Sequence, residues 1–345
     1  MTLHSEILEQ PERLQNLLRS QRGTVEKIAK KISSQNIQFV FLAARGTSDN
    51  AGRYANYLWG VKNSLPMALA TPSLFTYYQQ PPKIQNALVV GISQSGQSPD
   101  IVSVVEEGKK QGNLTLAITN ESNSPLTKNA DFILDIQAGD EKAVAATKTY
   151  TSQLMTIAML SVAMSGKEAR WDELAQVAEW ADSALKQDQK IARAAQRYRY
   201  MQQCVVLGRG YNYATAFEWA LKLKELTYVA AEPYSSADFK HGPVATVESG
   251  FPVFAISPKG KVFNSMQKML KHLKNDLRAE LVIVSNSLAS LELAEIAIPI
   301  PENVPEWLSP LIGIIPAQLF TYHLTLAKGY NPEEPRTIQK VTETR

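Results

Sequence analysis

Short apolar runs alternate along the chain with longer stretches whose apolar positions recur at a helical period. Examples of the short runs are residues 87–90, 116–118, 205–207 and 282–284. Runs that are apolar at every position, and not only at alternate positions, are typical of parallel strands covered by helices on both faces. The pattern therefore predicts an α/β protein built from doubly wound parallel sheets.

Three junctions between a predicted strand and the loop after it recur later in the chain at a nearly constant offset. The pairs, with offsets of 164, 164 and 166 residues, are Arg45 and Arg209, Ser93 and Ser257, and Asn120 and Asn286. A constant offset indicates internal duplication, so we predict two tandem domains of one fold. The predicted parts are an N-terminal helical segment (1–34), a first domain (35–165), a helical linker (166–199), a second domain (200–330) and a C-terminal tail (331–345).

A loop rich in hydroxyl groups follows one predicted strand of the first domain. Residues 91–98 read Gly-Ile-Ser-Gln-Ser-Gly-Gln-Ser and precede a predicted helix. Backbone N–H groups at a helix N-terminus, together with the side chains of Ser93, Gln94, Ser95 and Ser98, can hold a phosphate group. Serines also cap ordinary helices, so a plain strand-to-helix loop is the alternative. The corresponding loop of the second domain contains a proline, which removes a backbone donor, so only the first domain is expected to hold phosphate.

A second loop at the same predicted edge adds an arginine and two hydroxyl groups. Arg45, Gly46, Thr47 and Ser48 follow the first predicted strand. Ligands of doubly wound sheets bind beyond the carboxyl ends of the strands, so these residues are candidates for contacting the same ligand. Alternatively, Thr47 or Ser48 only caps a helix predicted at 49–59.

Three charged residues share one stripe of a helix predicted at about 215–228. Glu218, Lys222 and Glu225 are spaced at i, i+4 and i+7. A solvated stripe of ion pairs is the simple interpretation. The rest of this helix is apolar almost all round, however, and charges on a mostly buried helix usually face a partner or a cavity. We therefore treat the three residues as candidates for acid–base chemistry.

Two loops complete the set of candidates. His241 is followed by glycine and proline, and a histidine titrates near neutrality, which suits a proton shuttle. Small residues in the loop that contains Glu141, Val144 and Ala145 allow a ligand to approach the backbone closely. The remaining histidines are interpreted as structural or surface residues: His4, His272 and His323.

The composition of the chain excludes several classes of protein. With 345 residues, of which 44% are hydrophobic and 20% charged, the chain is expected to form a globular protein of about two domains. A net charge of +3 without a long basic run argues against nucleic-acid binding. The single cysteine, Cys204, excludes disulfides and zinc fingers. We expect a cytoplasmic protein with no membrane segment, because no apolar signal segment is present and Pro310 and Pro316 interrupt the longest apolar run.

Together these motifs make the chain resemble the SIS (sugar isomerase) family, most closely the isomerase half of the glutamine:fructose-6-phosphate amidotransferases. The resemblance extends from residues 6–11 to residues 335–340. It implies a homodimer that acts on a sugar phosphate without a metal or redox cofactor. The residues that it assigns to the phosphate are Thr47, Ser48, Ser93, Gln94, Ser95 and Ser98.

The resemblance also implies roles for the other candidates. Glu225 would move a proton between C1 and C2 of the sugar, assisted by Lys222. His241 would open the sugar ring, from the neighbouring subunit of the dimer. Lys340 would come from a C-terminal tail that closes the site, where it can form a Schiff base with the open-chain ketose. Two more residues assigned to the same site are Glu141 and Glu218.

The chain departs from the amidotransferases at several positions. Ala146 stands where they have a serine that contacts sugar hydroxyls, and Leu74 replaces an acidic residue. The chain also begins without the glutaminase domain that supplies their ammonia. We therefore expect the reverse reaction, the deamination of glucosamine 6-phosphate to fructose 6-phosphate and ammonia.

Three other functions are compatible with the motifs. The chain could cleave a phosphorylated fructosamine (an Amadori adduct), or act as an aminotransferase that depends on free ammonia or on a partner. It could also be a non-catalytic sugar-phosphate sensor. The presence of Glu225, His241 and Lys340 together argues against a sensor, because sensors of this family lack the acid–base set.

Overall fold

The computed structural model describes residues 2–340 of the chain. They form two compact units, each built around a sheet of five strands. We call these the N-unit (residues 12–141, 148–176 and 339–340) and the C-unit (residues 2–11, 142–147 and 177–338). The stretch predicted as a helical linker is divided between the units after Gln176. The last five residues of the predicted tail, 341–345, lie outside the described residues.

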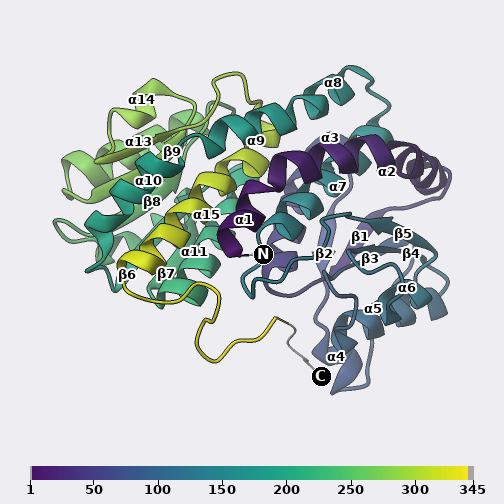
Figure 1. The fold of residues 1–345 in the computed structure, drawn as a ribbon. Helices are drawn as coiled ribbons and strands as arrows, with labels where there is room; N and C mark the ends of the chain where they lie inside the picture. The colour runs from purple at the N-terminus through teal and green to yellow at the C-terminus, as the bar shows by residue number, and fades with distance from the viewer. Residues whose placement is uncertain (1, 341–345) are drawn as a thin grey trace. The chain divides into compact units, whose positions relative to one another are not determined.

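The N-unit sheet has the strand order β2-β1-β3-β4-β5, and its paired strands are all parallel (Figure 1). Its strands are β1 (Phe39–Ala43), β2 (Met67–Leu69), β3 (Ala87–Ile92), β4 (Leu114–Thr119) and β5 (Phe132–Asp135). Its helices are α2 (Gln10–Ser33), α3 (Gly46–Asn63), α4 (Ser73–Thr76), α5 (Pro99–Lys110), α6 (Pro125–Asn129), α7 (Lys148–Ser165) and α8 (Ala169–Ala175). Helices α5 and α6 cover one face of the sheet, where Val105 and Leu126 pack against Val89. On the other face α3 packs against α7, and the indole N–H of Trp59 donates to the carbonyl of Ile157 at 3.2 Å.

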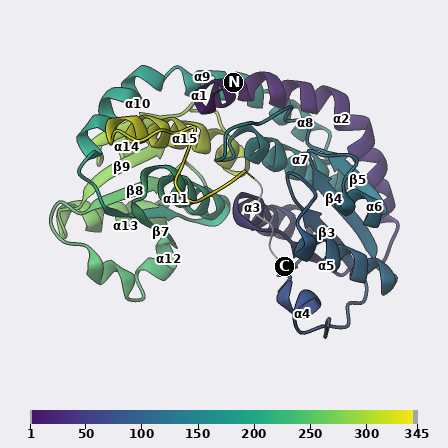
Figure 2. The same ribbon diagram turned by 60° about the horizontal axis from the view of Figure 1, so that its bottom comes forward.

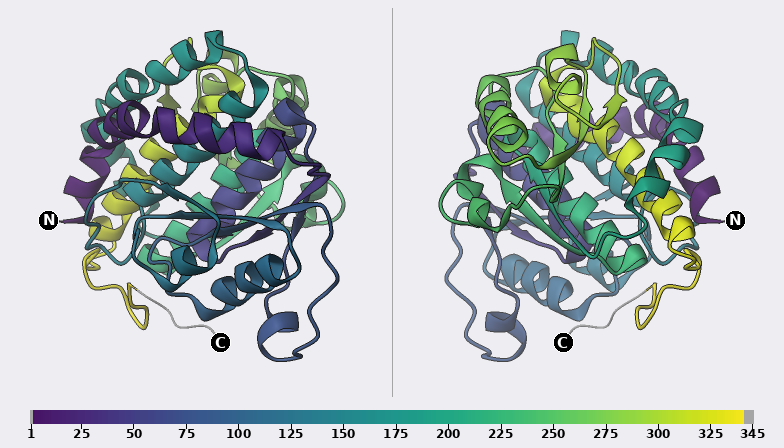
Figure 3. Two further views of the ribbon diagram at one scale, coloured as in Figure 1. Left: turned by 90° about the vertical axis from the view of Figure 1, so that its right-hand side faces the viewer. Right: turned by 90° about the vertical axis from the view of Figure 1, so that its left-hand side faces the viewer.

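The C-unit sheet has the strand order β10-β9-β8-β6-β7, again with parallel pairs only. Its strands are β6 (Gln203–Gly208), β7 (Ala230–Ser235), β8 (Pro252–Ile256), β9 (Glu280–Ser285) and β10 (Ile296–Pro299). Its α-helices are α1 (Leu3–Leu8), α9 (Val177–Leu185), α10 (Asp188–Ala195), α11 (Tyr213–Thr227), α12 (Ser236–Phe239), α13 (Phe263–Asn275), α14 (Leu288–Leu291) and α15 (Ser309–Ala327). Its 3₁₀ turns are η1 (Gln196–Tyr198), η2 (Gly210–Asn212), η3 (Pro243–Thr246) and η4 (Glu306–Leu308). Helix α15 packs against α1, α9, α10 and α11 (Figures 2 and 3).

The two units repeat one topology. Matching β1–β5 with β6–β10 in chain order brings the two strand orders into exact correspondence. The backbone repeats as well: Arg45 and Arg209 are both extended, and each precedes a glycine in the left-handed region, Gly46 at φ +53° and Gly210 at φ +60°. The predicted α/β class and the internal duplication are confirmed.

The apolar run near the C-terminus is a core helix. The stretch Glu306–Ala327 has the length and hydropathy of a membrane span, and 78% of its apolar window is buried within the protein. Burial explains its composition, since a helix that is apolar all round packs in a core as readily as in lipid. The expectation that two prolines interrupt this run is wrong. Pro310 falls in the first turn of α15, where proline is tolerated, and Pro316 lies within the helix.

The two copies differ where β1 and β6 end. In the first copy Ala44 directly follows β1, and α3 begins at Gly46 without an intervening turn. In the second copy the corresponding residue is Gly208, and the 3₁₀ turn η2 precedes α11. A Cβ atom on Gly208 would lie 2.1 Å from the carbonyl oxygen of Asn212 at the end of that turn. The inserted turn therefore requires glycine at this position.

We expect Gly208→Ala to lower the free energy of unfolding by roughly 1–3 kcal/mol, because the methyl group would overlap backbone atoms that cannot move aside cheaply. Urea unfolding followed by circular dichroism measures the change. Gly23→Ala is the matched control, since a Cβ on Gly23, within α2, meets no atom within 4 Å. A Gly208→Ala protein as stable as the control would show that the close approach of Asn212 is not a real constraint.

Candidate active site

The hydroxyl-rich loop of the N-unit connects β3 to α5. The Ser93 hydroxyl accepts a hydrogen bond from the Gly96 N–H at 3.1 Å, and the Ser95 hydroxyl accepts one from the Gln97 N–H at 3.3 Å. Gly96 has φ +62°, and a Cβ there would overlap the Ser124 side chain. The loop is thus a tight turn that leads into α5. Ser98 is at the N-cap of α5 but makes no side-chain capping bond, so capping does not explain this serine.

The loop after β1 begins at the same edge of the sheet, because β1 and β3 are parallel neighbours. Arg45 is the N-cap residue of α3, and its Nε donates to the buried carboxylate of Asp100 in α5 at 2.7 Å. Ser48 is buried and accepts from the Gln153 amide at 3.0 Å. The alternative that Thr47 or Ser48 caps the helix is wrong, since α3 starts at Gly46 and both residues lie inside its first turn.

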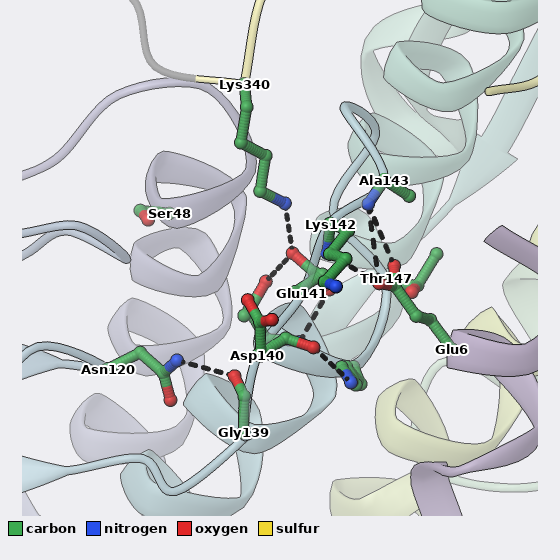
Figure 4. A network of polar contacts seen from close by, with 12 residues as sticks. Glu6, Ser48, Asn120, Gly139, Asp140, Glu141, Lys142, Ala143, Thr147 and Lys340 are labelled. Atoms are coloured by element: carbon green, nitrogen blue, oxygen red, sulfur yellow. Dashed lines mark hydrogen bonds and ion pairs between the residues drawn. The ribbon is translucent and has the colours of Figure 1, made fainter. Parts of the chain in front are cut away.

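Lys340 and Glu141, two of the predicted site residues, form an ion pair within the N-unit. The Lys340 ammonium lies 2.6 Å from Oε2 of Glu141, whose side chain is fully buried (Figure 4). The same carboxylate accepts from the backbone N–H and the hydroxyl of Thr149, at 3.1 and 2.8 Å. A cavity of about 570 Å³ is lined by these two residues and by Gln94 and Ser95 of the hydroxyl-rich loop. Two of the phosphate candidates, Gln94 and Ser95, and the tail lysine therefore border one cavity, whereas the other four candidates are not part of its lining.

In the C-unit, helix α11 holds Lys222 between two carboxylates. The ammonium lies 2.6 Å from Oε2 of Glu225 and 3.4 Å from Oε1 of Glu218. The side chains of Glu218 and Lys222 are 0% and 2% exposed, whereas that of Glu225 is 23% exposed. The interpretation as a solvated stripe is therefore wrong. Glu225 is the member of the cluster with access to a ligand.

Three other predicted site residues, His241, Val144 and Ala145, also lie in the C-unit. His241 is exposed, and its backbone N–H donates to the carbonyl of Asp238 at 2.9 Å. Within residues 2–340 its ring makes no hydrogen bond, so it is available to an external group. Val144 is partly buried and Ala145 is buried in the loop that follows Glu141.

Two residues that the sequence did not single out clamp this loop at both ends. Glu6 of α1 is fully buried and accepts from the backbone N–H groups of Lys142 and Ala143, at 2.6 and 3.2 Å (Figure 4). At the other end the Gln318 amide donates to the carbonyl of Thr147 at 3.3 Å. The sequence held one signal of this role, because Glu6 shares a helix face with the buried Leu3.

The corresponding loop of the second copy is occupied by the protein's own carboxylate. The backbone N–H groups of Lys261 and Val262 donate to the Glu306 carboxylate, at 2.9 and 3.4 Å. The Lys259 N–H donates to the side-chain oxygen of Asn286 at 2.7 Å. The backbone N–H groups that could bind an anion in this loop already have acceptors within the protein. This is a second reason, besides Pro258, to expect phosphate binding in the first copy only.

We expect Glu6→Gln to destabilise the protein by roughly 1.5–3 kcal/mol, because the neutral amide keeps the shape but replaces one acceptor oxygen with a donor that faces backbone N–H groups. The measurement is the free energy of unfolding in urea. Glu12→Gln provides the control, since Glu12 is exposed near the start of α2. Equal stability of the two variants would mean that the loop does not depend on Glu6.

Comparisons with known proteins agree with this architecture. The SIS domain family matches residues 32–163 and 200–328. Glutamine–fructose-6-phosphate aminotransferase (isomerizing) of Thermococcus kodakarensis is 34% identical over 345 residues, which cover 97% of this chain and 56% of that protein. The chain thus spans a little over half the length of this curated relative.

Two solved structures have the same fold. The C-terminal domain of glucosamine-fructose-6-phosphate aminotransferase from Francisella tularensis superposes with a TM-score of 0.88 at 28% identity, covering 96% of this chain and 98% of that one. Glucosamine-6-phosphate deaminase from Thermotoga maritima, at 21% identity and full coverage of both chains, has a TM-score of 0.82 and shares the fold. With both of its sheets matched by one family, the chain belongs to the SIS domain family.

Proposed function

We propose that the chain is a phosphosugar isomerase that converts glucosamine 6-phosphate to fructose 6-phosphate and ammonia. The observation that carries the proposal is the buried Lys222 between Glu218 and Glu225. Burying an ammonium and a carboxylate in a helix is costly, so such a cluster marks a functional site more often than a structural one. Support for the substrate class comes from the names of the relatives, which act on fructose 6-phosphate.

The phosphate is held, in this proposal, by the hydroxyl-rich loop of the N-unit. The backbone N–H groups at the start of α5 carry partial positive charge, and Ser93, Ser95 and Ser98 add hydroxyl donors. Thr47 and Ser48 contribute from the first turn of α3. Lys340 adds a positive charge at the rim of the same cavity. Binding of the phosphate fixes one end of the open-chain sugar, which orients its reacting carbons.

The C-unit supplies the proton transfer. His241 opens the pyranose by moving a proton between the ring oxygen and the C1 hydroxyl. The Glu225 carboxylate then takes the proton from C2 and returns it at C1, while O1 gains a proton and the amine loses one. This converts the amino aldehyde to a ketose imine. Lys222 stabilises the negative charge that develops on O1 as the C2 proton leaves.

Water completes the reaction by adding to C2 of the imine and releasing ammonia. The only thiol among the 345 residues is that of Cys204, which is buried in β6, and burial raises its pKa. A thiol held protonated is a poor nucleophile, so Cys204 is not a candidate for releasing ammonia from glutamine. Dilute ammonia in water favours hydrolysis over amination.

A second candidate is the cleavage of a phosphorylated fructosamine by the same proton transfer and imine hydrolysis. The cavity beside the hydroxyl-rich loop favours it, because its lining includes the carboxylates of Glu121, Asp135 and Asp140. A cationic substituent on the amine would find opposite charge there. The two functions differ only in which amine leaves.

One assay separates the candidates. Ammonia release is measured with glucosamine 6-phosphate, free-amine release with a fructosamine 6-phosphate of lysine, and glucosamine 6-phosphate formation with fructose 6-phosphate and ammonium. Ammonia release from the first substrate supports the deaminase. Turnover of the fructosamine 6-phosphate alone would reject the deaminase in favour of a deglycase. If none of the substrates reacted, a non-catalytic sugar-phosphate sensor would be the remaining function.

We expect Ser95→Ala to weaken binding of glucosamine 6-phosphate by about 1–3 kcal/mol, the loss of one hydrogen bond to a charged group. Calorimetry measures the affinity, with Ser34→Ala, an exposed position at the end of α2, as the control. Unchanged affinity of the Ser95 variant would exclude its hydroxyl from the phosphate site.

We expect Glu225→Gln to keep the affinity for substrate but to lower kcat by roughly 10² or more, because the general base is lost while the phosphate contacts remain. Steady-state kinetics separate the two effects. Glu232→Gln, an exposed carboxylate in β7, is the control. If the Glu225 variant instead lost affinity and kept its kcat, another residue must be the base.

A further inference from the structure

Three side chains from distant parts of the chain meet in the C-unit, outside the residues of the proposed reaction. Nε2 of His4 in α1 lies 3.0 Å from Oδ2 of Asp188 in α10, and Nε2 of His323 in α15 lies 2.6 Å from Oδ1 of the same carboxylate. One ligand atom from each residue lies within 4.8 Å of the others. Three helices therefore present two imidazoles and a carboxylate to one point.

The rings are held in place by packing. The His4 ring stacks on Tyr322, with centroids 4.8 Å apart and an interplanar angle of 16°. It also meets His323 edge-on at 5.9 Å. The side chains of His4, Asp188 and His323 are 28%, 25% and 15% exposed. The cluster is thus preorganised but open enough for a solvent molecule to reach it.

The local charge is negative. Among the described residues Asp188 pairs only with the two histidines and with no lysine or arginine. A second carboxylate, Glu333, lies nearby and accepts from the backbone N–H of Leu3 at 3.0 Å. Burial first, and then the charges of Glu333 and Asp188, raise the pKa of Tyr322. A cation is favoured in such a field.

We propose that His4, Asp188 and His323 bind a divalent transition metal of the zinc class. Two imidazole nitrogens, one carboxylate oxygen and one water make a common zinc ligand set. In tetrahedral zinc sites the ligand atoms are about 3.3 Å apart, so the two N···O separations here need only small adjustments. Without a metal, the Asp188 carboxylate accepts a hydrogen bond from each Nε2–H. Metal binding moves both protons to Nδ1 or releases them, and the metal takes their place.

The bound metal joins α1 to α10 and α15. Helix α1 has only six residues, and its Glu6 clamps the loop that begins at Lys142. The metal therefore stabilises the segment that carries this clamp. The site does not depend on the proposed reaction, and its test is independent of turnover.

The experiment uses the full chain, freed of metal by dialysis against a chelator. Calorimetric titration with Zn²⁺ is expected to give one site per chain, and the melting temperature is expected to rise with zinc concentration because the metal binds the folded state. Co²⁺ is expected to give the visible absorption of a four- or five-coordinate site. Absence of saturable zinc binding would overturn the proposal.

Variants assign the binding to the cluster. We expect His4→Gln, His323→Gln and Asp188→Asn each to weaken zinc binding at least about a hundredfold, more than the loss of an outer-shell partner. His272→Gln is the matched control, because His272 also pairs with an aspartate, Asp276, at 2.7 Å. Both side chains of this pair are exposed at the end of α13, and among the described residues no third ligand lies with them.

Circular dichroism checks that each variant folds. If Asp188→Asn does not fold, the zinc affinity of His4→Gln tests the proposal instead. His4 lies in the short terminal helix α1, so the rest of the fold is expected to tolerate this change. Zinc affinity that is unchanged in the two histidine variants of the cluster would overturn the proposal. So would a melting temperature that responds to pH between 5 and 8 but not to zinc, because the cluster would then be a proton-dependent clamp.

Discussion

Every paired strand in both units is parallel, and this constraint organises the rest of the structure. Each connection between parallel strands must cross a face of the sheet, so helices cover each sheet and the central strands β3 and β8 are buried along their whole length. All strands of a sheet then end at the same edge. The loops after β1 and β3 meet there, which brings Ser48 and the Ser93–Ser98 loop to one side of the N-unit.

Because the fold is duplicated, each unit has one sheet edge at which the strands end. The two copies differ in which groups accept hydrogen bonds from the backbone N–H groups of the loop at that edge. In the first copy the serine hydroxyls of the loop itself accept from the backbone N–H groups of Gly96 and Gln97. In the second copy the Glu306 carboxylate accepts from Lys261 and Val262, so an internal anion takes the place available to a ligand. A hydroxyl that accepts from the backbone can still donate to a ligand, whereas an ionised carboxylate cannot.

The buried charges of α11 have no comparable structural explanation. Apolar residues at the positions of both Glu218 and Lys222 would avoid the cost of removing a carboxylate and an ammonium from water. The ion pairs offset part of that cost, and the graded exposure from Glu218 to Glu225 leaves one carboxylate accessible. This arrangement is what a site for proton transfer requires, since the base must be reachable and held in one orientation.

The fold class and the duplication could be predicted from the amino-acid pattern alone, because a parallel strand that is buried on both faces must be apolar at every position, as at Ala87–Ile92. The pattern also placed Glu218, Lys222 and Glu225 on one stripe, since the helical period sets which neighbours share a face. It gave only weak signals for contacts between residues far apart in the chain.

Only the tertiary structure decided that Glu6 clamps a loop 136 residues away, that Asp188 joins His4 to His323, and that Glu306 fills the second loop. The physical reason is that hydrogen bonds of this kind depend on burial and on the relative placement of helices. No local pattern of polar and apolar residues encodes either of these.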